Sequence, residues 1–236
     1  MELLFDKKWS LIAVAVLLGA CGGRSDPVDR LSRELSRFPE YSVVVDDLDI
    51  KDGFFPDYFL GLRIITASGQ RIAGRDSLVY NERKERHEVS KDVFARYENY
   101  LGMVVASKTR DGRVTGARQA YPMGYQYVGN PMYGSWGGGG FWQFYGQYAF
   151  MRSMMGGWNV GRNDYDNYRT YQGRGQPYYG PVSNGRSTFG TRGAQTEKSR
   201  PNFYKRNKQR LGSGRQAFSG RVQSRSSGGS AWGRGK

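Results

Sequence analysis

Two stretches, residues 41–48 (YSVVVDDL) and residues 58–67 (YFLGLRIITA), decide the fold class of this chain. Both are rich in β-branched and aromatic residues, which are enriched in strands. The second stretch is mostly apolar, which favours a central position in a sheet, and it ends at the turn signal Ser68-Gly69. The sequence therefore predicts two strands of one sheet over these residues.

One helix is predicted before the two strands in the sequence, and another is predicted after them. Asp26-Pro27 places a capping carboxylate before a proline at the first helical position, and Pro39 ends the helix that follows. Ser90 is the predicted cap of a second helix. Each helix has one apolar face: Val28, Leu31, Leu35 and Phe38 in the first, and Val93, Phe94, Tyr97, Tyr100 and Leu101 in the second.

Three further strands complete the expected domain. Residues 77–89 alternate in polarity and predict an exposed strand, and residues 103–108 and 114–120 flank the hairpin signal Asp111-Gly112. We therefore expect residues 26–120 to form a small α+β domain, in which two helices pack against a mostly antiparallel sheet.

The composition changes sharply near residue 120. Residues 22–120 contain 17 Lys or Arg and 16 Asp or Glu, whereas residues 121–236 contain 17 and only 3. The second half also holds 24 of the 34 glycines and 12 of the 17 tyrosines. We predict a Gly/aromatic segment over residues 121–158, in which Arg152 is the one charged residue, and a Gly/Tyr/Arg-rich, basic, largely disordered tail over residues 159–236.

The Gly/aromatic segment predicts a contact surface. Four consecutive glycines at residues 137–140 argue against a membrane-spanning helix, although residues 141–155 could form a short one with Gln143 and Gln147 on one face. Aromatic side chains favour the water–lipid interface, so membrane contact is one expectation. Packing on the folded domain and self-association are the alternatives. The predicted contact residues are Phe141, Trp142, Phe144, Tyr145 and Trp158.

The tail is expected to attract polyanions. From Lys198 to the end there are 11 basic residues and no acidic one. Such a segment binds an anionic membrane surface or polymer, and Arg among aromatic residues also suits nucleic acid. A solvated tail without a dedicated partner is the alternative. The predicted contacts are Lys205, Arg206, Lys208, Arg210 and Arg215.

The N-terminus has the parts of a signal peptide. Lys7-Lys8 precedes an uncharged apolar stretch over residues 9–20, which is too short to span a bilayer. The tetrapeptide Leu18-Gly19-Ala20-Cys21 then resembles the lipobox of bacterial lipoproteins. The resemblance implies that signal peptidase II recognises Leu18, Gly19 and Ala20 and removes residues 1–20. It also implies a diacylglycerol on Cys21, with residues 21–25 as a tether.

Two further patches resemble the uncharacterised glycine-rich bacterial lipoproteins of the YgiB/YjfM type. One runs from Phe141-Trp142 to Gly156-Gly157, and the other covers residues 214–236. That family implies no reaction and no catalytic residue. Gly22, directly after Cys21, implies the outer membrane in envelopes that have one.

Other sites find little support. The chain has one Cys and one His, which excludes an intrachain disulfide and a two-histidine metal site. His87 lies among charged residues without a marked nucleophile. The acidic run from Asp46 to Asp52 departs from a calcium loop, because Lys51 and Tyr58 stand at ligand positions. Neither a cofactor nor a metal is expected.

The sequence thus predicts a non-enzymatic envelope lipoprotein. Its lipid would be attached to Cys21, and its aromatic and basic segments would contact membrane, anionic envelope polymers or other copies of the chain. The alternative is a nucleic-acid-binding protein that uses the Arg/Tyr/Gly-rich tail. A wall hydrolase is a third class, and it would need a cleft at His87.

Overall fold

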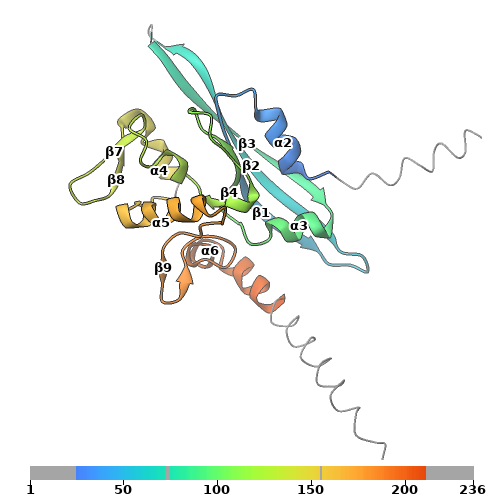
Figure 1. The fold of residues 1–236 in the computed structure, drawn as a ribbon. Coiled ribbons are helices and arrows are strands. Elements are labelled where there is room, and N and C mark those ends of the chain that lie inside the picture. Colours follow the sequence, from blue (N-terminus) through green and yellow to red (C-terminus); the bar gives the residue numbers. More distant parts are fainter. Residues whose placement is uncertain (1–24, 73–74, 155, 211–236) are drawn as a thin grey trace, which may run out of the picture.

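The computed structural model describes residues 25–72, 75–154 and 156–210, and they build an α+β fold around one antiparallel sheet (Figure 1). The strand order is β3-β2-β1-β4-β5, and β6 pairs with β4. The meander β1–β2–β3 is followed by a connection that crosses the sheet and places β4 beside β1. The strands are β1 (Glu40–Lys51), β2 (Asp57–Ile72), β3 (Arg75–Val89), β4 (Met103–Lys108), β5 (Val114–Thr115) and β6 (Tyr121–Pro122).

Helices α2 (Pro27–Leu35) and α3 (Lys91–Tyr97) cover one face of the sheet, as the sequence predicts. The Asp26 carboxylate accepts a hydrogen bond of 2.9 Å from the amide of Val28, and the Ser90 hydroxyl accepts one of 3.3 Å from the amide of Val93. Both predicted caps are therefore confirmed. The apolar faces of the two helices pack on Val43, Val45, Leu60, Leu62 and Ile64.

The opposite face of the sheet is covered by residues that follow the sheet in sequence. Val44, Ile65 and Val104 point to this face and pack against aromatic side chains from residues 121–178. Since successive residues of a strand point to opposite faces, a strand covered on both sides needs consecutive apolar residues. This explains why residues 43–45 (VVV) of β1 and Ile64-Ile65 of β2 are consecutive apolar residues. In Figure 1, α4 and α5 lie on the side of the sheet away from α2 and α3.

We call this covering the aromatic layer (residues 121–178). It continues into a short hairpin and the last helices of the described residues. Its elements are η2 (Tyr125–Tyr127), β7 (Gly134–Trp136), β8 (Trp142–Phe144), η3 (Gly146–Tyr148), α4 (Phe150–Met154) and α5 (Arg162–Gly173). After it come β9 (Val182–Ser183), β10 (Arg186–Ser187) and α6 (Ala194–Ser199), while η1 (Ala117–Gln119) precedes it. Residues 201–210 are helical as well.

Two carboxylates fasten the tyrosines of the aromatic layer. Glu40, at the start of β1, accepts hydrogen bonds from Tyr133 and, at 2.9 Å, from Tyr80. Asp164 of α5 accepts hydrogen bonds from Tyr178 and, at 2.5 Å, from Tyr125. Buried tyrosines thus contribute ring area to the core and still satisfy their hydroxyl groups.

The prediction of disorder from residue 159 onward is wrong for residues 159–210. Val160, Tyr168 and Tyr178 are buried in the aromatic layer, and Thr191 and Thr196 are buried beyond it. The physical reason is that tyrosine rings supply apolar area although the segment is polar and glycine-rich by composition. The rest of the predicted tail, residues 211–236, lies outside the described residues.

Two smaller expectations also change. A helix over residues 141–155 is wrong for residues 141–149, because Trp142–Phe144 pair with Gly134–Trp136 as strands and Gly146–Tyr148 form a 3-10 turn. Gln143 lies on β8, so it does not share a helical face with Gln147. The strand expected over residues 114–120 is confirmed only at Val114–Thr115, since η1 follows.

Candidate functional site

The β7–β8 hairpin forms one wall of an open pocket of about 510 Å³, which we call the aromatic pocket. Aromatic, amide and guanidinium groups face the same space. The lining residues are Phe141, Trp142, Gln143, Phe144, Ala149, Arg152, Trp158, Asn159 and Val160.

Glycine allows the close approach that builds the hairpin. A Cβ atom on Gly134 would lie 2.2 Å from the carbonyl oxygen of Gln143, so no larger residue fits there. Trp136 and Trp142 face each other across the hairpin with ring centroids 5.2 Å apart, in an edge-to-face arrangement. The Arg162 guanidinium lies 4.7 Å from the centroid of Trp136 and fixes the hairpin to α5.

Four of the five aromatic residues predicted as a contact surface come together in this pocket. Trp142 is buried, Phe144 and Trp158 are half-buried, and Phe141 is 53% exposed. Tyr145 is exposed but does not line the pocket. The four rings therefore line one recess, and contact of these residues with a membrane stays a prediction.

The predicted polyanion contacts lie on the helix of residues 201–210, which we call the basic helix. Lys205, Arg206, Lys208 and Arg210 are exposed there, and the segment contains no acidic residue. The end of the basic helix is attached to the β1–β2 turn, because Arg210 Nη2 lies 3.0 Å from a carboxylate oxygen of Asp52. Arg215 lies outside the described residues.

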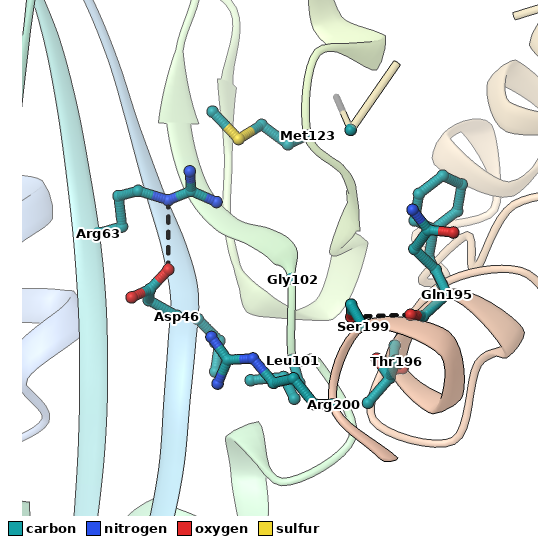
Figure 2. Close-up of a pocket in the computed structure, with 13 residues that line it drawn as sticks. Asp46, Arg63, Leu101, Gly102, Met123, Gln195, Thr196, Ser199 and Arg200 are labelled. Carbon is teal, nitrogen blue, oxygen red and sulfur yellow. Dashed lines mark hydrogen bonds and ion pairs between the residues drawn. The ribbon is translucent and has the colours of Figure 1, made fainter. Parts of the chain in front are cut away.

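A second cavity, of about 190 Å³, lies between the sheet and α6 (Figure 2). Asp46 of β1 and Arg63 of β2 reach into it from the sheet, and Gln195, Thr196 and Ser199 border it from α6. Met123, Leu101 and Phe189 contribute apolar walls.

The charges around this cavity are paired with one another. Asp46 lies 3.0 Å from Lys84 and 3.4 Å from Arg63, and Arg200 lies 3.1 Å from Asp47. The Arg200–Asp47 pair connects the end of α6 to β1, whereas the two pairs of Asp46 lie within the sheet. Exposed pairs of this kind each add little stability. The charged side chains around the cavity thus form ion pairs with one another, and its described lining residues do not include a nucleophile paired with a base.

His87 lies between charged side chains, and the acidic run takes part in ion pairs. His87 Nε2 lies 3.0 Å from Glu85 and Nδ1 lies 3.5 Å from Arg30. Asp49 pairs with Arg86 at 2.7 Å. In the part of the chain that the structure describes, no group of three His, Cys, Asp or Glu side chains could hold a metal ion.

Sequence reasoning missed the β1–β2 turn. Phe54 is 93% exposed and Phe55 is 82% exposed, more than any other large apolar side chain in the described ranges. The signal was available, since Gly53 and Pro56 mark residues 53–56 (GFFP) as a turn with two aromatic residues in it. It also missed Glu40, which has no exposed surface and whose pKa is raised by burial.

The predicted recognition residues Leu18, Gly19 and Ala20 and the lipidated Cys21 lie outside the described residues. None of the helices in residues 25–72, 75–154 and 156–210 combines the length and apolarity needed to cross a bilayer. Comparison of the chain with protein-family models, curated proteins and solved structures finds no significant match in any of the three.

Proposed function

We propose that this chain is a non-enzymatic lipoprotein of a bacterial envelope, held to a membrane by acyl chains on Cys21. The observation that carries the proposal is the tetrapeptide Leu18-Gly19-Ala20-Cys21 at the end of an apolar leader. Two or three acyl chains give stable anchoring where a single one gives only reversible binding. Gly22 favours the outer membrane as the destination.

The fold supports this arrangement because it starts directly after the proposed anchor. Asp26, the N-cap of α2, follows Cys21 by five residues. The folded part would therefore stay close to the membrane surface. Its exposed basic helix suits anionic headgroups or envelope polymers, and the aromatic pocket suits a partner with a flat apolar face.

Inhibition of signal peptidase II tests the anchor. With globomycin, we expect a precursor that retains residues 1–20 to accumulate, and Cys21→Ser should release the protein from membranes. Gly23→Ser, outside the lipobox, is the matched control and should leave processing unchanged. Intact mass spectrometry should show a chain that starts at Cys21 and carries acyl groups. A native chain that begins at Met1 with a free thiol would refute the proposal.

The alternative is a nucleic-acid-binding protein, which the basic helix favours because it presents four cations without an acidic residue. Titration of the whole chain with single-stranded DNA at two salt concentrations tests it. Micromolar binding that weakens steeply with salt is its minimum requirement. Lys205→Gln with Lys208→Gln should then weaken binding, and the protein should fractionate with nucleoid or ribosomes rather than membranes.

A further inference from the structure

The turn between β1 and β2 exposes two phenylalanine rings to solvent. Phe54 and Phe55 stack edge to face with centroids 4.9 Å apart, so they form one apolar knob. Burying a phenylalanine side chain is worth about 1.5–3 kcal/mol relative to leaving it in water. Exposed apolar groups of this kind mark sites of contact with a partner or a membrane.

The turn holds both rings outward. Gly53 and Pro56 flank them, and residues 51–57 are all exposed. The next phenylalanine along the chain, Phe59, is partly covered instead, because the Arg86 guanidinium lies 4.1 Å from its ring centroid and the Lys51 ammonium lies 4.9 Å from it. The knob is thus separate from the core and is bordered by cations.

The basic helix lies against the same turn. Arg210 Nη2 is 3.0 Å from Asp52 and 3.5 Å from the carbonyl oxygen of Ile50. Arg210 compensates the Asp52 carboxylate, and Arg86 compensates Asp49 at 2.7 Å. Asp57, two residues after Phe55, is a further exposed acidic residue beside the knob, so only part of the local negative charge is compensated. Lys205, Arg206 and Lys208 are exposed on the basic helix, whose last described residue reaches the turn.

The start of the described fold lies at this end of the molecule too. Asp26 accepts hydrogen bonds from Tyr97 at 2.8 Å and Arg96 at 2.6 Å, and both donors belong to α3. In turn, the Phe94 ring of α3 packs 5.3 Å from that of Tyr58, the second residue of β2. Figure 1 shows α3 and the β1–β2 turn at the lower right end of the sheet, and α2 on the right above them. Asp26 is five positions after Cys21, which corresponds to at most about 18 Å of extended chain.

From these contacts we infer that the β1–β2 turn and the basic helix form a second, non-covalent membrane-docking surface. Phe54 and Phe55 enter the interfacial region of the bilayer, and the cations of the basic helix bind anionic headgroups. The occupant is a lipid surface, because an aromatic knob bordered by basic residues matches the chemistry of interfacial anchors. The inference deepens the proposed function, since the acyl anchor on Cys21 would bring this end of the fold to the membrane.

Vesicle sedimentation tests the inference without the lipid anchor. The protein used is the chain from residue 21 onward with Cys21→Ser, which contains every described residue. Because the substituted side chain cannot be acylated, binding of this chain to vesicles does not depend on acyl groups. We expect it to bind phosphatidylcholine vesicles that contain phosphatidylglycerol. Phe54→Ser with Phe55→Ser should lower the partition coefficient by at least about tenfold. Lys205→Gln with Lys208→Gln should lower it less, and only on the anionic vesicles.

The matched control replaces two other exposed apolar residues. Val114 of β5 and Val182 of β9 are 65% and 70% exposed, and Val114→Ser with Val182→Ser should leave the partition coefficient unchanged. Circular dichroism verifies that each variant is folded. Equal losses in the two double variants, no loss in the phenylalanine variant, or no binding by the parent chain would each overturn the inference. So would a parent dimer that the phenylalanine variant converts to a monomer, because the knob would then be covered by a second copy. Correct acylation of Cys21 in cells would still support the proposed function in all these cases.

Discussion

Glu40 is a buried acidic residue whose protonation is linked to folding. Its side chain has no exposed surface, and burial raises its pKa above the ordinary value of 4.5, although hydrogen bonds from Tyr133 and Tyr80 partly oppose this. A raised pKa in the folded state means that the folded protein binds this proton more tightly than the unfolded chain does. The contribution to stability is therefore complete below the unfolded pKa and is lost as pH rises through the folded pKa.

Glu40→Gln should remove this pH dependence. The amide can keep one oxygen as an acceptor for a tyrosine hydroxyl, and it carries no charge to bury. We expect the free energy of unfolding of the wild type, relative to the variant, to fall as the pH rises above the ordinary pKa of 4.5 and through the raised pKa of the folded state. Urea denaturation at several pH values measures it, and Glu82→Gln on the exposed side of β3 controls for the lost charge. A difference between wild type and variant that does not change with pH would contradict the prediction.

At the scale of elements, β2 depends on one glycine. Gly61 lies opposite Asp47, beside the register shift of β1, and a Cβ atom there would be 2.7 Å from the Cβ of Asp47. Gly61→Ala should therefore lower the free energy of unfolding by about 1–3 kcal/mol. Gly69→Ala is the control, because nothing lies within 4 Å of that position on the same strand. Equal urea midpoints for the two variants would contradict the prediction, because they would show that β1 shifts to accommodate the added methyl group without loss of stability.

The docking of α5 depends on Asp164. Two phenols, those of Tyr125 and Tyr178, donate to its carboxylate, and both rings are buried. Asp164→Ala leaves both donors without this acceptor and should lower the free energy of unfolding by about 2–3 kcal/mol. Asp166→Ala removes an exposed acid from the same helix and should change it by less than about 0.5 kcal/mol. Thermal or urea unfolding of the pair separates a structural carboxylate from a general loss of charge.

The sequence predicts the elements whose signals are local. The caps Asp26 and Ser90, the strand propensities of β1 and β2, and the polar alternation of β3 each depend on neighbouring residues. The aromatic layer depends on contacts distant in sequence: Tyr133 and Glu40 are 93 residues apart. Glycine- and tyrosine-rich composition is also shared by disordered segments, so composition alone favours disorder there. The consecutive apolar residues 43–45 (VVV) and Ile64-Ile65 were the available signal, because they require a cover on both faces of the sheet.

The candidate site divides in the same way. The sequence identifies the four aromatic residues of the pocket as a group because they lie within residues 141–158. It does not predict that Trp142 is buried, since this follows from the pairing of β8 with β7. Nor does it predict that the basic helix meets the β1–β2 turn, because Arg210 and Asp52 are 158 residues apart.

At the scale of the whole molecule, the sheet and the aromatic layer should unfold together. Side chains of β1 and β2 are buried against α2 and α3 on one face and against the aromatic layer on the other. Loss of the aromatic layer would therefore expose apolar side chains of the same strands that form the core under the helices. We expect the backbone amides of α5, and that of Tyr178, which bonds to Ala120 at 2.8 Å, to be protected from hydrogen exchange about as strongly as those of β1. Native-state hydrogen exchange read by mass spectrometry measures this. Free-peptide rates across residues 162–178 beside a protected sheet would contradict it.

The two edges of the sheet have a consequence for molecules crowded on a surface. An unpaired strand is a template onto which a neighbouring copy can add its own backbone, and repetition of this step produces fibres. Here β3 forms one edge with dense charge of both signs at residues 82–88, and β5 forms the other with only two residues. In most registers, a strand of a second copy that adds to β3 would place like charges opposite each other. At the other edge, the two residues of β5 offer too few backbone hydrogen bonds for a strand to add. Copies concentrated in two dimensions would therefore remain separate particles instead of growing into a continuous ribbon.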